Sequence, residues 1–185
     1  MPTTPTLRFR TATPSDAPSI HHLVESAFRT TDPRPNWTGN TNLASSFRLD
    51  MDDVKARIAN PDVATLLAFT DHDTLAASIE VSRHGNLCGR LSMIAVDDAY
   101  QRSGVGGRVL EYAEEYCRKV WAVNMFSLNA LSTRKALIEW YLRRGYSRTG
   151  ETSPFPRESF EGLELPPGMC FVEMEKRFDT GEGCS

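Results

Sequence analysis

The sequence has few cysteines and histidines, and neither residue type follows a spacing that binds metals. The four histidines form no HExxH motif, whereas zinc sites depend on such spacings. The four cysteines are far apart and form no CxxC pair: Cys88, Cys117, Cys170 and Cys184. We therefore expect reduced thiols rather than a disulfide framework, and no metal site.

Long apolar runs and an excess of one charge are also missing. No stretch approaches the length of a membrane span, and residues 1–10 (MPTTPTLRFR) lack the apolar core of a signal peptide. The formal net charge of −3 gives no general reason to expect a nucleic-acid partner. We expect a cytoplasmic protein that binds neither membranes nor nucleic acids.

The length and composition are those of one folded globular domain. The chain has 185 residues, of which 40% are hydrophobic and 24% charged, enough to bury a sizeable core. We find no internal repeat, linker or second core. The sequence predicts a single domain over residues 1–185, with its core in 7–178 and a polar tail in 179–185.

In the first third of the chain, the spacing of apolar residues predicts a strand followed by helices. Residues 7–12 are typical of a short strand, and a helix follows from about Ser15, with apolar residues at helical spacing up to Phe28. A polar loop spans 30–46. A second helix is expected after Asp50, ending at Asn60-Pro61.

The middle of the chain predicts three consecutive strands, over 63–69, 74–81 and 91–96, joined by short turns. Such a series forms an antiparallel meander. In the second strand, alternation places Ser78 and Glu80 on the face opposite Ile79.

The remainder predicts alternating helices and strands. A helix after the third strand has five residues on its inner side: Val109, Tyr112, Ala113, Tyr116 and Val120. Then come a strand (125–131), a helix (133–144) and two strands (145–151 and 170–178), separated by a Pro-rich loop over 153–168. A strand-helix-strand crossover places its two strands parallel in one sheet.

A glycine-rich turn joins the third meander strand to its helix. It lacks the Lys-Ser or Lys-Thr of a P-loop, and it does not lie in the first βα turn, where a dinucleotide fingerprint belongs. Unpaired amides and the helix dipole make this helix start positive, and glycines let a pyrophosphate approach it. The alternative is a turn that only lets helix and sheet pack closely. The candidate residues are Gln101, Arg102, Ser103, Gly104, Val105, Gly106 and Gly107.

Two motifs resemble those of the GCN5-related N-acetyltransferases, the GNAT superfamily. Residues 96–106 (VDDAYQRSGVG) are similar to the Q/R-x-x-G-x-G/A signature, and 141–146 (YLRRGY) to Y-x-x-x-G-F/Y. The order of predicted elements is similar too, over nearly the whole chain. The resemblance implies the GNAT fold, an α/β fold with a single mixed central sheet, an antiparallel N-terminal meander and helices on both faces.

The resemblance also implies a function: transfer of an acetyl group from acetyl-CoA to a primary amine, by direct attack in a ternary complex. A small-molecule amine is the expected acceptor. The acetyl carbonyl and pantetheine arm would meet the strand residues Ile94, Ala95 and Val96, and the turn would bind the pyrophosphate. Tyr141 would protonate the leaving thiolate, although a tyrosine at this spacing also packs against Leu137.

The sequence departs from the family pattern at two positions. An asparagine that many members carry seven residues before the tyrosine is Arg134 here, so either Asn129 or Arg134, or neither, contacts the CoA arm. A glutamate that some relatives use as base falls on Arg90. Glu80 is the leading candidate base, unless it is a solvated residue on its strand or waters carry the proton.

Trp37 and Phe155 are candidate substrate-binding residues because each is a large apolar side chain in a polar, Pro-containing loop. Such aromatics also attach loops to the core. Other functions remain open: a non-catalytic CoA-binding sensor or partner module, a protein or peptide N-acetyltransferase, and a nucleotide-binding regulatory domain. A homodimer is compatible with the family resemblance.

Overall fold

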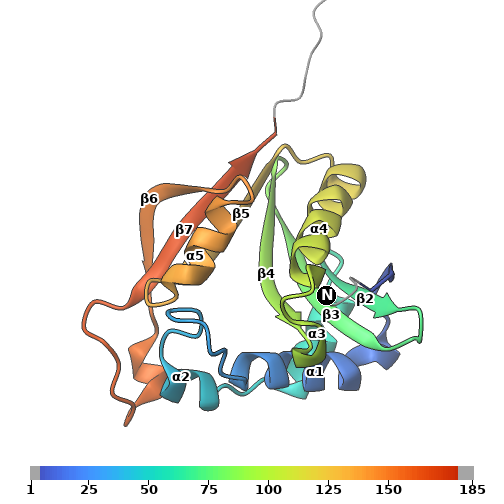
Figure 1. Cartoon of the computed structure of the whole chain (residues 1–185). Helices are drawn as coiled ribbons and strands as arrows, with labels where there is room; N and C mark the ends of the chain where they lie inside the picture. The colour runs from blue at the N-terminus through green and yellow to red at the C-terminus, as the bar shows by residue number, and fades with distance from the viewer. Residues whose placement is uncertain (1–4, 179–185) are drawn as a thin grey trace, which may run out of the picture.

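Seven strands form one mixed sheet, in the order β1-β2-β3-β4-β5-β7-β6, in the computed structural model (Figure 1). The structure describes residues 5–178, so the predicted polar tail, 179–185 with Cys184, lies outside the described residues. The strands are β1 (Leu7–Thr11), β2 (Val63–Thr70), β3 (Leu75–His84), β4 (Cys88–Val96), β5 (Met125–Leu131), β6 (Ser147–Pro154) and β7 (Cys170–Arg177). The α-helices are α1 (Ala17–Arg29), α2 (Thr41–Ser45), α3 (Met51–Ala59), α4 (Val105–Trp121) and α5 (Lys135–Leu142).

The predicted meander is confirmed. Strands β2, β3 and β4 pair antiparallel in chain order, and β4 then pairs parallel with β5, as the crossover through α4 requires. The sheet is therefore mixed, with β1 added antiparallel to β2 and β7 inserted between β5 and β6.

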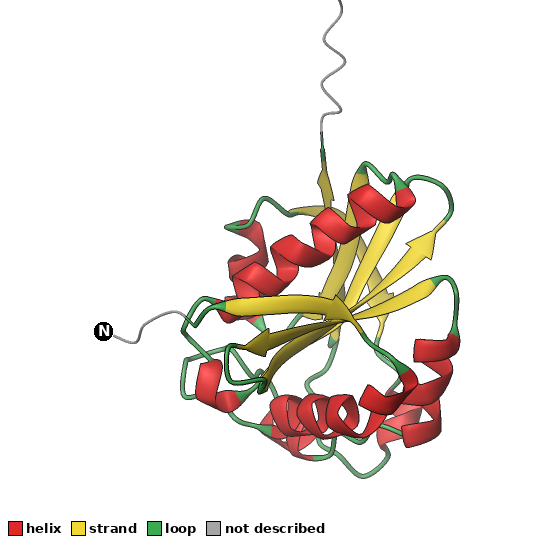
Figure 2. Ribbon diagram, turned by 90° about the vertical axis from the view of Figure 1, so that its right-hand side faces the viewer, coloured by secondary structure: helices red, strands yellow, loops and turns green. Residues whose placement is uncertain are grey.

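Helices cover both faces of the sheet (Figure 2). On one face, α4 and α5 bury the larger apolar cluster, centred on Phe126, Leu66 and Leu110. On the other face, α1 and α3 bury a smaller cluster that includes Ile20 and Val54. No helix within residues 5–178 is both long and apolar enough to cross a bilayer.

One prediction for α4 is wrong. Val120 continues the helical stripe of buried residues, but its side chain is 56% exposed. The fully buried residues of α4 end at Cys117, and in the last turn Trp121, not Val120, packs against the core.

The sheet divides between β4 and β5. These two strands pair only at residues 88–90 and 125–127, whereas β4 continues its pairing with β3 as far as Val96. The two strands are seen to part beyond this short ladder (Figure 1). Within residues 5–178, the rest of β4 therefore has one edge without a strand partner, and this edge positions the candidate site.

A bulge lies in this same part of β4. Ser78 of β3 pairs with Ala95 and Glu80 pairs with Ser92, so β4 has one more residue than β3 between the two pairs. Met93, inside the bulge, has a φ of 51°, a conformation that costs energy for a residue with a side chain. The bulge re-aims the strand immediately before Ile94 and Val96.

Candidate active site

The unpartnered edge of β4 presents backbone amides to the opening in the sheet. The amide of Asp97 donates to the carbonyl of Ala76 on β3 (2.9 Å). Successive strand residues direct their amides to opposite edges, so the amides of Val96 and Ile94 point toward the side that β5 has left. The amide of Ala95 points to the opposite edge, toward β3, and its side chain is buried under α1 (2% exposed). Of the three predicted residues, Ile94 and Val96 have the geometry to donate to a bound acyl carbonyl.

The glycine-rich turn follows this edge directly. Gly104 caps α4 with a φ of 83°, a conformation that explains why glycine is needed there. A Cβ on Gly104 would meet nothing within 4 Å, and one on Gly106 would make only ordinary contacts with Val96 and Trp140, at 3.6 Å. The fold therefore requires glycine at position 104 but not at 106, and open space lies beside Gly104 at the start of α4.

Two side chains, one from α5 and one from the turn that follows it, lie against this glycine-rich turn, and we did not predict them. A Cβ on Gly107 would be 3.0 Å from Nη2 of Arg144, so this guanidinium lies directly on the helix start. It also stacks on the ring of Trp140, at 3.7 Å from the ring centroid. The signal was present in the sequence, because Arg144 lies within the YLRRGY motif that pointed to Tyr141.

Tyr141 lies on α5, the helix that borders the opening between β4 and β5. It is 4% exposed, with its ring centroid 5.0 Å from that of Trp140 and 5.8 Å from that of Tyr146. Burial raises the pKa of Tyr141 to about 12, against the opposing charges of Arg134 and Arg144. Its hydroxyl is thus protonated at physiological pH, as a proton donor must be.

Glu80 faces the α1 and α3 side of the sheet, next to the bulge. Ser92, the residue before Met93, donates to Glu80 Oε1 (3.3 Å), and Nη1 of Arg57 lies 3.2 Å from Oε2. Both distances are long for hydrogen bonds to a carboxylate. Glu80 therefore keeps capacity to accept a further donor.

A second carboxylate, that of Glu173 on β7, lies beside Arg90, the residue on which the glutamate of some relatives falls. Nη1 of Arg90 donates to Glu173 Oε2 (2.8 Å), and Ser153 and Asn129 donate to Oε1 (2.6 and 3.0 Å). Burial raises the pKa of Glu173, but these hydrogen bonds outweigh it and hold the pKa below its ordinary value. Glu173 is fully engaged and less basic than usual, so Glu80 is the better candidate base.

The segment that carries Trp37 packs on the start of α5. The carbonyl of Asn36 accepts from the amide of Ala136 (3.1 Å), and the Trp37 carbonyl accepts from Nε of Arg134 (2.8 Å). The rings of Trp37 and Trp140 meet edge to face at 6.4 Å. The structure thus joins Trp37 to Arg134 and α5, whereas Asn129 is held by Glu173 on the other face.

Phe155 takes part in an aromatic cluster. Its ring centroid lies 5.1 Å from that of Phe160 and 5.7 Å from that of Phe171 on β7. The Pro-rich loop is thereby attached to the sheet, which is the structural alternative to a substrate contact. This loop also meets the α2 region, where Nδ2 of Asn40 donates to the carbonyl of Glu164 (3.4 Å).

A divided mixed sheet, with an amide-bearing edge that runs into a glycine-rich helix start, defines the chain as an acyltransferase. The model of the acetyltransferase (GNAT) family matches residues 21–146. The chain belongs to this family, as its two motifs predicted. No curated protein sequence matches the chain significantly.

Solved acetyltransferase structures share the fold at low sequence identity. The ribosomal-protein-S18-alanine N-acetyltransferase of Escherichia coli has a TM-score of 0.70 and 16% identity, over 97% of this chain and 99% of that one. The PaiA N-acetyltransferase of Thermoplasma acidophilum, in complex with coenzyme A, has a TM-score of 0.69 and 18% identity, over 94% and 99%. A nourseothricin acetyltransferase has a TM-score of 0.62 and 22% identity, over 92% and 98%. The predicted α/β fold is therefore confirmed.

Proposed function

We propose that this chain transfers the acetyl group of acetyl-CoA to the primary amine of a small molecule, by direct attack in a ternary complex. The observation that carries the proposal is the unpartnered edge of β4, whose Ile94 and Val96 amides lead into the glycine-rich start of α4. The coenzyme A bound in the Thermoplasma relative supports the choice of co-substrate.

The start of α4 fits a pyrophosphate. The positive end of the helix dipole and its unpaired amides favour an anion there, and the open space beside Gly104 leaves room for one. Arg144, stacked on Trp140 beside Gly107, would add a fixed guanidinium, and the exposed Arg102 a mobile one. Gln101, Ser103 and Val105 complete the proposed cradle.

In the proposed reaction, one bond forms, one bond breaks, and one proton is released while another is taken up. The neutral amine attacks the thioester carbonyl carbon, so a C–N bond forms and the C–S bond breaks. The sulfur leaves with the bonding electron pair and takes a proton, while the acceptor nitrogen loses one. The β4 amides stabilise the negative charge that develops on the carbonyl oxygen, Tyr141 donates to the sulfur, and Glu80 accepts the proton from the amine.

The acceptor would enter on the α1 and α3 side of the sheet, where Glu80 lies. The acetyl group would lie at the bulge of β4, which Glu80 adjoins through Ser92. We propose no metal, nucleic acid or membrane in the reaction. The unpaired thiols of Cys88, Cys117 and Cys170 support a cytoplasmic location.

The test is acetyl-CoA-dependent release of free thiol with a panel of amines: amino acids, polyamines, aminoglycosides, arylamines and N-terminal peptides. We expect turnover with at least one small-molecule amine. Acetyl-CoA binding without turnover of any amine would instead identify a non-catalytic CoA-binding module. Turnover of peptides alone would identify a peptide N-acetyltransferase.

A further inference from the structure

A small cavity lies beside the bulge of β4, between the sheet and helices α1 and α3. Apolar side chains of both helices, with Leu49 and Met93, line most of it, and four polar side chains complete the lining: Arg57, Thr65, Ser78 and Glu80. The centre of a water molecule can occupy about 20 Å³ of this cavity, and roughly 10–15 Å³ on this measure is enough for one water. The cavity therefore has the size of a single water molecule.

Ser78 places an unsatisfied hydroxyl against this cavity. The residue is 1% exposed, and its Oγ has no hydrogen-bond partner within residues 5–178. A buried hydroxyl without a partner is costly, and such groups are rare in native proteins unless a water or ligand satisfies them. Because the cavity that Ser78 lines has room for one water, a water is the partner that fits.

The other polar side chains of the lining provide further partners for a water. Thr65 of β2 pairs in register with Glu80 of β3 and is itself 7% exposed. Ser78 lies two residues before Glu80, on the same face of β3. A buried water typically makes about three hydrogen bonds, and these three side chains offer two hydroxyls and a carboxylate.

The protein itself holds Glu80 only loosely. Nη1 of Arg57 lies 3.2 Å from Oε2, and the Ser92 hydroxyl donates to Oε1 at 3.3 Å. Both distances are long for hydrogen bonds to a carboxylate, and the Arg57 side chain is 41% exposed, so this ion pair contributes little. A third donor on the cavity side would fix the carboxylate.

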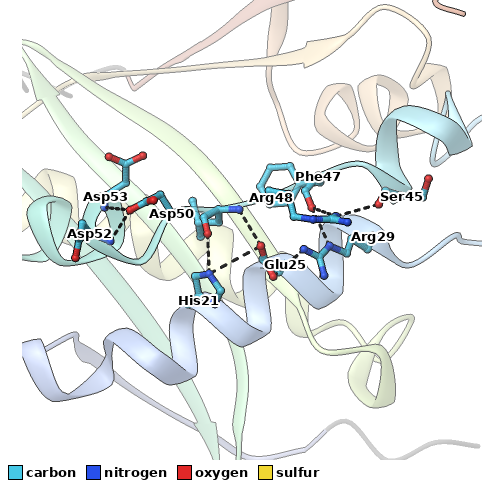
Figure 3. Close-up of polar contacts among 10 residues, drawn as sticks. His21, Glu25, Arg29, Ser45, Phe47, Arg48, Asp50, Asp52 and Asp53 are labelled. Atoms are coloured by element: carbon cyan, nitrogen blue, oxygen red, sulfur yellow. Dashed lines mark hydrogen bonds and ion pairs between the residues drawn. The ribbon is translucent and has the colours of Figure 1, made fainter. Parts of the chain in front are cut away.

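The wall opposite the sheet is held in place by α1 (Figure 3). Nε2 of His21 donates to the carbonyl of Leu49 (2.6 Å), and the amide of Leu49 donates to Oε1 of Glu25 (2.9 Å). Arg29 in turn binds both Glu25 (2.8 Å) and the Phe47 carbonyl (2.8 Å). Both backbone groups of Leu49 are therefore fixed, which keeps this wall at a set distance from the sheet.

We propose that one ordered water occupies this cavity, and that Ser78 acts through it as a positioning residue for Glu80. The Ser78 hydroxyl donates to the water, and the water donates to the Glu80 carboxylate. The carboxylate is thereby held beside Ser92 at the bulge, where the acceptor amine gives up its proton. This inference rests on the proposed function, because Glu80 is the proposed base.

The first test is a crystal structure of the full chain, compared with that of Ser78→Val. We expect a water within about 2.5–3.0 Å of both Ser78 Oγ and a Glu80 oxygen, the usual length of such hydrogen bonds. In Ser78→Val, methyl groups take the space of the water, and Glu80 takes up more than one conformer. A wild-type cavity without water, in a map that shows other buried waters, overturns the proposal. An unchanged single conformer of Glu80 in Ser78→Val also overturns it.

The second test measures kcat and the KM for acetyl-CoA. Ser78→Val should lower kcat at least about tenfold, the smallest loss expected for a hydrogen bond to a charged group, with KM unchanged. Ser78→Ala should lower kcat by a smaller factor, because the water keeps its other partners. Both variants should melt at the wild-type temperature or higher, since neither leaves a buried hydroxyl to satisfy. A merely structural role would instead lower the melting temperature along with kcat.

Ser82 provides the matched control. It lies two residues beyond Glu80 on the same face of β3, is half-buried and does not line the cavity, so Ser82→Val leaves kcat unchanged. A double-mutant cycle then shows whether Ser78 acts through Glu80: in a Glu80→Gln background, Ser78→Val should have no further effect on kcat. Equal losses with and without the carboxylate, or equal losses in Ser78→Val and Ser82→Val, overturn the positioning role.

The two proposals fail separately. Turnover of an amine by a protein whose cavity contains no water removes this inference and leaves the acetyltransferase intact. A water that binds Ser78 and Glu80 and is lost together with the Glu80 conformer in Ser78→Val, without thiol release from acetyl-CoA, retains the water site and removes the proposed reaction.

Discussion

Tyr141 combines burial with a position on α5, whose Trp140 lies beside the start of α4. Its pKa of about 12 keeps the hydroxyl protonated, so it can give a proton to a leaving thiolate. We expect Tyr141→Phe to lower kcat by about 10²–10⁴-fold, the usual contribution of a positioned general acid. Steady-state thiol release, with the acetyl-CoA dissociation constant measured separately, checks this.

The control for this substitution is Tyr112→Phe, which removes a hydroxyl from α4 while its ring still stacks on Phe9. It leaves kcat unchanged. If Tyr141→Phe also retains near-wild-type kcat, Tyr141 only packs against Trp140 and Tyr146, as the sequence pattern already allowed.

The raised pKa of Tyr141 also predicts the alkaline side of the pH profile. An ordinary tyrosine ionises near pH 10, and a general acid with that pKa would lose activity there. Because burial disfavours the phenolate, the protonated form persists to about pH 12. We expect kcat to rise as the amine deprotonates, with no fall near pH 10; a fall with an apparent pKa near 10 would contradict the role.

At the scale of elements, a buried polar network ties α4 to β7 and to the end of α5. Glu114 is 5% exposed; it accepts from the Tyr146 hydroxyl and from Nζ of Lys176, each at 2.8 Å. Removing the carboxylate leaves an ammonium and a phenol unpaired. Glu114→Ala should therefore lower the free energy of unfolding by about 3 kcal/mol, measured by urea denaturation.

The neighbouring Glu115 provides a matched control for Glu114→Ala. Glu115 lies on the same helix and pairs with Lys119, but both side chains are exposed, so Glu115→Ala has little effect. A similar loss in the two variants would show that the buried network does not determine the result.

Sequence patterns predicted the main elements because periodicity and turn residues mark them locally. The meander, the glycine turn and the helix after it all follow from such signals. The short helix α2 and the 3₁₀ turn at Arg157–Phe160 were missed, since both lie in polar or Pro-rich loops without an apolar period. Contacts with distant parts of the chain hold them instead. For example, Asn40, which caps α2, also donates a hydrogen bond to the Glu164 carbonyl.

The candidate site was predictable only where a motif carries it. Tyr141 and the turn residues lie in motifs, and Glu80 followed from strand alternation. Glu173 could not be found in this way, because it meets Arg90 from a strand 83 residues away through the register of β5 with β7. Contacts between strands that are not consecutive require the sheet order, which local patterns do not contain.

At the scale of the whole molecule, the opening between β4 and β5 lies between two halves of one sheet. Elements from both halves line it: β4 and the start of α4 from one, and α5 from the other. A ligand that lies in it contacts both halves and binds only the folded chain. Binding must therefore raise the stability of the entire domain.

This coupling is measurable as a shift in melting temperature. Acetyl-CoA at 100 times its dissociation constant stabilises the folded state by about 2.7 kcal/mol. For a domain of this size, each kcal/mol raises the melting temperature by about 2–4 °C, so the expected shift is about 5–10 °C. ATP and NAD at the same concentration should give smaller shifts, since neither has a pantetheine arm to meet the β4 edge; an equal or larger shift would favour a nucleotide-binding domain.

Gly106→Ala separates a ligand-binding role of the turn from a packing role. The added methyl makes only ordinary contacts with Val96 and Trp140, at 3.6 Å, and alanine favours a helix over glycine by about 0.5–1 kcal/mol. The free protein should therefore melt at the same temperature or higher. The methyl narrows the space beside the helix start, so the shift produced by a fixed acetyl-CoA concentration should decrease. An unchanged shift in melting temperature would mean that acetyl-CoA does not bind over Gly106. This glycine would then only allow the strand and the helix to pack closely.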